Sequence, residues 1–255
     1  MNKKKALIQY WHGLGDVIML TPLLRQLYKK GFLVDLMCRK SVKDSHLLDE
    51  CKYIDKLIVV ENPWGSTKGF SLQVKENMEL FNKLKSNYDF SSSINHLSTF
   101  NDKIIHNFKE GNINCDKDDL SLEVFISEDI NKKALEYINN MYPKGYIFNH
   151  TMIENHPPHN WDSTNWINNN LPNLPVVNTG KNNTHYMINE NINFSFVLAK
   201  NAKYRVLSSS VFVHACDAMN SEVEVVNYGK MDRKVWPKNK NLIKKVRELN
   251  KWIKK

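Results

Sequence analysis

Residues 5–27 read KALIQYWHGLGDVIMLTPLLRQL, and this stretch decides how the first half of the chain is expected to fold. Residues 6–11 form a short, mostly apolar run that leads to a turn with two glycines. Beyond Asp16, apolar side chains recur at the spacing of one face of a helix. The order strand, glycine turn, helix predicts the opening βα unit of a Rossmann-like parallel sheet.

The turn combines two glycines with a carboxylate. Gly13 and Gly15 carry no Cβ, so the backbone there can approach a ligand closely. Asp16 would lie at the N-terminus of the helix, where an aspartate commonly caps the free N–H groups. Capping and a role in chemistry are therefore both open for Asp16. The turn is not the dinucleotide fingerprint, because Ile18 stands where G-x-G-x-x-G requires its third glycine.

The continuation of this turn carries a family resemblance. Residues 13–27, GLGDVIMLTPLLRQL, resemble the N-terminus of glycosyltransferase family 9, the lipopolysaccharide heptosyltransferases and their relatives. Residues 204–218, YRVLSSSVFVHACDA, are similar to the family's downstream motif Asp-Ser-Gly-Pro-x-His. Ser210 and His214 keep their relative spacing, whereas serine, valine and phenylalanine replace the motif's aspartate, glycine and proline. The two matches occur in the family's order.

The resemblance implies an α/β protein of the GT-B type, with two Rossmann-like domains facing each other across a cleft. We expect an acceptor-side domain over residues 1–125 and a nucleotide-sugar-binding domain over residues 126–240. Residues 241–255 show an apolar stripe on a lysine-rich segment and are predicted to form an amphipathic helix. Packing across the domain junction and contact with a membrane surface are both open for this helix.

The resemblance also assigns site residues. Asp16 would be the base that removes a proton from the acceptor hydroxyl. A serine-rich strand end that leads into a helix N-terminus suits a diphosphate, although a serine-capped helix with an incidental histidine has the same pattern. His159 stands where relatives carry a lysine two residues before a tryptophan, here Trp161, and imidazole is mostly uncharged at neutral pH. The candidates for the donor and its phosphates are Thr151, His159, Thr179, Gly180, Ser209, Ser210 and His214, and those for the acceptor or cleft are Gly13, Gly15, Asn95 and His96.

The rest of the chain is expected to alternate strands and helices, as a covered parallel sheet requires. Strands are predicted at residues 33–39, 56–60, 88–95, 146–150, 174–180 and 223–229, and a further strand is expected to end in the serine-rich part of residues 204–218. Helices are predicted at residues 42–51, 70–87, 127–141 and 189–200, and after Trp161. Residues 101–119 are polar and predicted to be a loop or a variable cover for the acceptor, and residues 120–126 alternate as an edge or interdomain strand does.

Composition fits a soluble globular protein, with 42% hydrophobic and 25% charged residues among 255. No apolar run approaches the ~18 residues of a membrane span. The lysines at the start imitate a signal peptide, but His12, Asp16 and the glycine turn interrupt the apolar run. We expect a cytoplasmic protein that can lie at the inner face of a membrane. Its four cysteines form no C-x-x-C pair and are predicted to be free, buried thiols.

The formal net charge of +9 has two interpretations. A basic surface attracts nucleotide-sugar diphosphates, anionic lipid headgroups or nucleic acid, whereas lysine-rich helix faces can simply be solvated. The sequence has no arginine-rich stripe, zinc-finger spacing or RNP-like motif, so no nucleic-acid partner is expected. Residues 116–118, Asp-Lys-Asp, have the spacing of a metal motif but lie in a polar segment and are interpreted as surface charge.

The resemblance to glycosyltransferase family 9 implies an inverting glycosyltransferase, and we expect it to need no metal or other cofactor. It would move a sugar from a nucleotide-diphosphate donor to a hydroxyl of a glycan or glycolipid. Two alternatives stay open. The first is a non-catalytic member of the same fold that binds a nucleotide or glycan, because the downstream motif is altered. The second is a basic protein that binds nucleic acid or a membrane surface, because of the net charge and the terminal segment.

Overall fold

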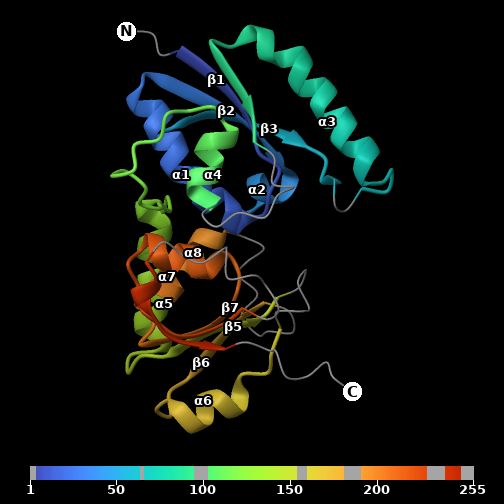
Figure 1. Cartoon of the computed structure of the whole chain (residues 1–255). Helices are drawn as coiled ribbons and strands as arrows, with labels where there is room; N and C mark the ends of the chain where they lie inside the picture. The colour runs from blue at the N-terminus through green and yellow to red at the C-terminus, as the bar shows by residue number, and fades with distance from the viewer. Residues whose placement is uncertain are drawn as a thin grey trace. The chain divides into compact units, whose positions relative to one another are not determined.

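The computed structural model describes residues 4–63, 66–94, 103–153, 160–180, 191–228 and 239–247 of the chain. The chain forms two compact units, Met1–Leu122 and Glu123–Lys255, and this division lies next to the boundary expected after residue 125. Each unit contains a parallel sheet with helices against it (Figure 1). The predicted α/β class with two Rossmann-like sheets is therefore confirmed.

The first unit is built on a four-stranded parallel sheet of order β3-β2-β1-β4. Figure 1 shows α1 and α4 on one face of this sheet and α3 on the other. The strand order reverses between β1 and β4, which places the switch point of the sheet, where such folds bind ligands, at the carboxyl ends of these strands. The elements are β1 Lys4–Gln9, α1 Leu14–Lys29, β2 Phe32–Arg39, α2 Lys40–Asp44, β3 Ile54–Val60, α3 Phe70–Leu84, a 3-10 turn Lys85–Asn87, β4 Phe90–Ser93 and α4 Lys103–Glu110.

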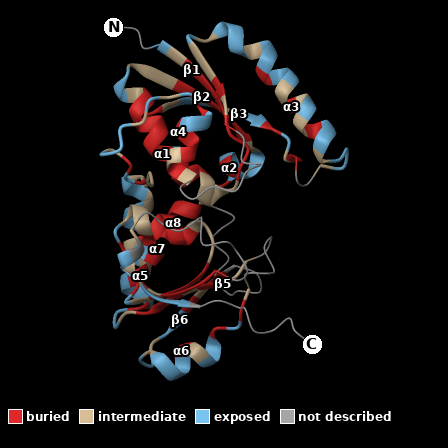
Figure 2. Cartoon of the chain, viewed as in Figure 1, coloured by how far each residue is buried: buried red, intermediate tan, exposed pale blue. Residues whose placement is uncertain are grey.

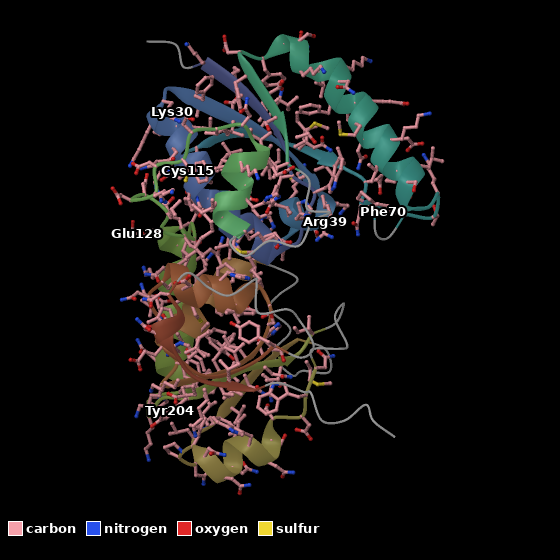
Figure 3. The ribbon with its side chains drawn as sticks, in the orientation of Figure 1. Lys30, Arg39, Phe70, Cys115, Glu128 and Tyr204 are labelled. Carbon is pink, nitrogen blue, oxygen red and sulfur yellow. The ribbon has the colours of Figure 1, made fainter. Side chains whose placement is uncertain are left out.

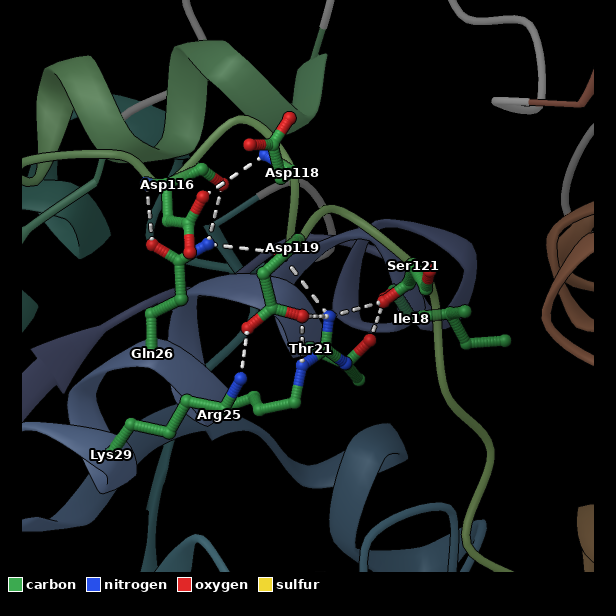
Figure 4. Close-up of polar contacts among 9 residues, drawn as sticks. All are labelled: Ile18, Thr21, Arg25, Gln26, Lys29, Asp116, Asp118, Asp119 and Ser121. Atoms are coloured by element: carbon green, nitrogen blue, oxygen red, sulfur yellow. Dashed lines mark hydrogen bonds and ion pairs between the residues drawn. The ribbon is translucent and has the colours of Figure 1, made fainter.

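Helix α1 is buried all round from Val17 to Leu27, which is more than the single apolar face of its sequence predicts (Figure 2). It also contains Pro22, which has no N–H to donate to the carbonyl of Ile18 one turn earlier. The hydroxyl of Thr21 donates to that carbonyl instead, at 2.8 Å (Figure 4). The Thr-Pro pair therefore lets the helix continue through the proline without leaving a buried acceptor unsatisfied.

The second unit is built on a parallel sheet of order β6-β5-β7-β8-β9. Its switch point lies between β5 and β7. Ser127 caps the first helix, since its Oγ accepts from the N–H of Ile130 at 3.2 Å, as the acidic start after this serine predicts. The elements are α5 Glu128–Met141, β5 Ile147–Met152, α6 Thr164–Asn170, β6 Val176–Gly180, α7 Ile192–Asn201, β7 Tyr204–Ser208, α8 Val211–Ala218, β8 Val223–Asn227, a 3-10 turn Lys240–Leu242 and β9 Ile243–Arg247.

Two predictions for the end of the first unit are wrong. Within the expected loop 101–119, residues 103–110 form helix α4, because Ile104 and Phe108 lie one turn apart and are buried; α4 packs against α1. Residues 120–126 form no strand. Their alternating pattern still buries Leu120 and Leu122, but the neighbouring backbone is hydrogen-bonded by side chains of α1 and not by a strand.

Side chains of α1 hold residues 116–121, a segment that we call the strap, against the helix (Figure 4). Arg25 donates through Nε to Asp119 Oδ1 at 2.8 Å and through Nη2 to the carbonyl of Ser121 at 2.9 Å. Gln26 donates to the carbonyls of Asp116 and Asp119, both at 2.9 Å, and accepts from the N–H of Asp116. A side-chain clamp thus replaces the ladder that a strand would have made.

The terminal amphipathic helix predicted for residues 241–255 is also wrong over the part that the structure describes. Ile243–Arg247 is strand β9 and pairs in parallel with β8. The open edge of β8 offers backbone hydrogen bonds, and Lys244 bridges to Glu224 at 2.8 Å and Glu222 at 3.1 Å. Tertiary pairing overrides a helical period that is only a few turns long. The helix that suggested membrane contact is absent from residues 239–247.

The remaining predictions are close to the observed elements. The strands agree within a few residues, whereas the helix expected over residues 42–51 is only the short α2. All four cysteines are free, and Cys38, Cys51 and Cys216 are buried while Cys115 is half-buried, which largely confirms the prediction. Within the described ranges, every helix is too short or too polar to cross a bilayer.

Candidate functional site

Asp16 lies just beyond the carboxyl end of β1, as the third residue of α1. Its Oδ2 accepts from the N–H of Gly13, the N-cap residue, at 3.0 Å, so the capping role that the sequence left open is real. The hydroxyl of Tyr10, the residue after β1, donates to the Asp16 carbonyl at 3.1 Å and holds the same turn. The carboxylate is therefore held in one orientation at the switch point of the sheet.

Two cations that sequence reasoning missed accompany this carboxylate. Lys103, the first residue of α4, forms an ion pair through Nζ with Asp16 Oδ1, and the two side chains are 17% and 23% exposed. Arg39, the last residue of β2 (Figure 3), also acts electrostatically on Asp16 and donates to Asn62 Oδ1 at 3.4 Å. Its position at the end of a buried strand is a signal that could have found Arg39. Lys103 carries no such signal, because it stands in a polar segment whose composition predicts a loop.

Gly13 adopts backbone angles that any residue can adopt, with φ −70° and ψ 168°. A Cβ at this position would lie 3.5 Å from Asp16 Oδ2 and 3.8 Å from Arg39 Nη2. Glycine is therefore not needed for the turn itself. Its missing side chain leaves the carboxylate and the guanidinium uncovered on this side. Gly15 is the second residue of α1.

The basic side chains around Asp16 differ in their charge. Burial lowers the pKa of His12 to about 3, against the opposing charge of Asp16, so this imidazole is neutral. Burial also lowers the pKa of Arg39 from its ordinary value, with Asp16 again opposing the shift, and an arginine stays charged under such a shift. One carboxylate thus faces two cations and one neutral ring. Such a site can accept a proton from a hydroxyl at the carboxylate and hold an anionic oxygen at Arg39, since the Lys103 ammonium is already paired with the carboxylate.

In the second unit, the residues of β5 and β6 that were predicted to bind the sugar donor lie on neighbouring strands, but their hydroxyls are already hydrogen-bonded within the protein. Thr151 Oγ1 hydrogen-bonds to Ser163 Oγ at 3.1 Å, and Thr179 Oγ1 to Nδ1 of His150 at 3.0 Å. Both threonines are buried. Neither partner is among the predicted site residues. His150 lies in the polar end of a buried strand, which is a signal that could have found it, whereas Ser163 only precedes a helix. Gly180 is the last residue of β6 and pairs with Met152.

The turn from β7 to α8 is more accessible. Ser210 caps α8, since its Oγ accepts from the N–H of Phe212 at 3.3 Å, which is the alternative that the sequence left open. Ser209 donates its N–H to the carbonyl of Asn227 at 2.8 Å. Both serines are half-buried, whereas His214 is only 6% exposed. Ser209 and Ser210 are thus the candidates on this turn that a ligand reaches with least rearrangement.

Three predicted site residues, Asn95, His96 and His159, lie outside the described residues. Asp116 and Asp118 belong to the strap, where Asp116 Oδ1 accepts from the N–H of Asp118 at 3.0 Å. Across the described part of the chain, no three histidine, cysteine, aspartate or glutamate side chains gather as a metal site would require.

Comparison with known proteins identifies the fold. No protein-family model and no curated protein sequence matches the chain. A glycosyl transferase of family 9 from Veillonella parvula DSM 2008 is similar with a TM-score of 0.66 and 13% identity, over 97% of this chain and 87% of that one. ADP-heptose LPS heptosyltransferase II of E. coli gives 0.58 and 15%, over 96% and 90%. The E. coli heptosyltransferase WaaC, solved with ADP, gives 0.58 and 11%, over 96% and 93%.

These similarities extend over nearly the whole of each chain and include both units. They show that the chain has the GT-B fold of the family 9 glycosyltransferases, which confirms the resemblance found in the sequence. At identities of 11–15% they establish the fold alone, and activity has to be argued from the site.

Proposed function

We propose that this protein transfers a sugar from a nucleotide-diphosphate donor to a hydroxyl of a glycan or glycolipid acceptor, with inversion and without a metal ion. The observation that carries the proposal is the Asp16 carboxylate at the switch point of a Rossmann-like sheet, fixed by Gly13 and accompanied by Lys103 and Arg39. The fold shared with solved glycosyltransferases supports it.

In this mechanism Asp16 acts as the general base. The acceptor oxygen attacks the anomeric carbon and loses its proton to the carboxylate, while the bond from that carbon to the donor phosphate breaks. The electron pair leaves with the nucleotide diphosphate, which needs electrostatic stabilisation. The turn between β7 and α8 is the part of the second unit that we assign to the diphosphate, because Ser209, Ser210 and the helix N-terminus offer hydroxyl and N–H donors.

The first test is a thermal-shift panel of nucleoside diphosphates and nucleotide sugars, each with and without EDTA. A ligand that binds only the folded state raises the melting temperature. We expect one nucleotide to do so equally well in EDTA, and the shift to disappear in a Ser209→Ala, Ser210→Ala double variant. A shift that EDTA removes would contradict metal independence, and a flat panel at millimolar ligand would contradict the donor site.

The second test is transfer by Asp16→Asn with the donor that the panel identifies. Asparagine keeps a side-chain oxygen for the N–H of Gly13, so the cap is retained. The variant loses the ion pair with Lys103, so its melting temperature is measured alongside transfer to show that it is folded. Loss of the base is expected to lower kcat/KM by about 10²- to 10⁴-fold. Transfer at the wild-type rate would exclude Asp16 as the base.

A non-catalytic binding protein is the second candidate, and one observation favours it. Both carboxylate oxygens of Asp16 are engaged by the protein itself, one in the cap and one by Lys103. Such a protein would give the thermal shift with a nucleotide but no transfer to any acceptor, in wild type and in Asp16→Asn alike.

A further inference from the structure

The ion pair between Lys103 and Asp16 joins two segments that are far apart in the sequence. Lys103 Nζ reaches Asp16 Oδ1 from the first residue of α4, and both side chains are largely shielded from water, at 17% and 23% exposure. An ion pair so shielded is screened less than a surface pair. It is therefore expected to affect the ionisation of Asp16 more than a surface contact would.

Helix α4, which carries Lys103 at its first position, is fixed against α1. Ile104 and Phe108 are buried, and α4 packs against α1, the helix that carries Asp16. Asn107 donates through Nδ2 to the carbonyl of Met19 in α1 at 3.2 Å. The lysine is thus presented from a helix fixed to α1 at a second point, and its ammonium is directed to one oxygen of the carboxylate.

From these contacts we infer that Lys103 is a positioning residue for Asp16, and this inference rests on the proposed function. Gly13 holds Oδ2 from the helix cap and Lys103 holds Oδ1 from α4, so the carboxylate cannot rotate. The ammonium also favours the charged form of the carboxylate, which is the form that accepts a proton. Lys103 thereby keeps the base both oriented and ionised without touching the substrate.

Among the described residues, three other groups face Asp16 and make different contacts. Arg39 from β2 adds a second positive charge but also donates to Asn62. His12 is buried and neutral, and Tyr10 donates to the backbone carbonyl of Asp16 and not to its carboxylate. Within the described residues, Lys103 is the cation in direct ion-pair contact with the carboxylate.

The test compares Lys103→Met, Lys103→Arg and Lys109→Met, the last being an exposed lysine on the same helix as a matched control. Titration of the Asp16 carboxyl carbon by NMR is the first readout, because it needs no substrate. Loss of the lysine is expected to raise the titration midpoint by roughly one pH unit, since one opposite charge near a carboxylate shifts it by about 1–3 units and Arg39 remains. Lys103→Arg and Lys109→Met should titrate as wild type does.

The second readout is the pH profile of kcat/KM, whose acid limb reports the base of the free enzyme. In Lys103→Met this limb should move to higher pH by the same amount as the titration midpoint. An unchanged midpoint, or an acid limb that does not follow it, would overturn the inference. If wild type shows no transfer with any donor, the proposed function fails by itself, and the carbon titration still decides whether Lys103 controls Asp16.

Discussion

Arg25 is expected to be the most sensitive single point of the strap. It is 8% exposed and donates to Asp119 Oδ1, to the Asp119 carbonyl at 3.2 Å and to the Ser121 carbonyl at 2.9 Å (Figure 4). Methionine has a similar aliphatic length but no donor, so Arg25→Met keeps much of the packing and removes these hydrogen bonds. The strap would then depend on Gln26 and Lys29.

The magnitude follows from the burial of the two partners. Breaking a fully buried ion pair costs about 3–5 kcal/mol, but Asp119 is 19% exposed and keeps Lys29 at 2.8 Å. Hydrogen bonds to a charged group contribute about 1.5–3 kcal/mol. We therefore expect Arg25→Met to lower the free energy of opening the strap by about 2–3 kcal/mol, the lower part of the combined range.

Hydrogen exchange measured by mass spectrometry over residues 114–122 gives this free energy locally, even if the two units unfold separately. The expected loss corresponds to exchange about 30- to 150-fold faster. The matched control is Lys30→Met, which removes only an exposed contact to the Asn114 carbonyl at 3.0 Å and should change the free energy by less than about 0.5 kcal/mol. Exchange in Arg25→Met within threefold of wild type would refute the reasoning.

The effect of Arg25 should also depend on pH. The Arg25 guanidinium, and then Lys29, hold the pKa of Asp119 below its ordinary value. A depressed carboxyl pKa contributes stability above the ordinary value of about 3.9, and that contribution is lost as the pH falls through the lower pKa of the folded protein. The difference in the free energy of opening the strap between wild type and Arg25→Met should therefore become smaller in acid. A difference that stays constant down to pH 2 would contradict this account.

Two further predictions concern buried titratable groups. Burial lowers the pKa of His150 to about 4, so between that value and about 6.5 the unfolded chain binds a proton that the folded unit does not. The free energy of unfolding should therefore fall as the pH drops from about 6.5 toward 4, by up to roughly 1.4 kcal/mol per pH unit. Urea unfolding of His150→Asn should show a flatter dependence on pH, and a slope equal to that of wild type would contradict the pKa assigned to His150. Burial raises the pKa of the Cys38 and Cys216 thiols to about 12. At pH 8, iodoacetamide should therefore label the half-buried Cys115 well before either of these two cysteines. Labelling of Cys38 or Cys216 at a rate comparable to that of Cys115 in the folded protein would contradict their burial.

The sequence carried the local part of the fold well. A short apolar run, a glycine turn and a helical period at residues 5–27 produced β1 and α1 because each signal lies within a few residues. Ser127 and Ser210 cap helices as their types predict. The elements that sequence reasoning missed or misread are the ones whose hydrogen bonds go to distant partners, namely α4, the strap and β9.

The candidate site divides in the same way. The sequence determined by itself that Asp16 follows β1 in a glycine turn and that Ser209 and Ser210 precede a helix, because strand, turn and cap are encoded locally. Only the tertiary structure decided that Arg39 and Lys103 face that carboxylate and that Thr151 and Thr179 are already hydrogen-bonded. The physical reason is that strand order and helix packing bring together side chains far apart in the sequence, and burial then sets their charge and reach, which no local pattern records.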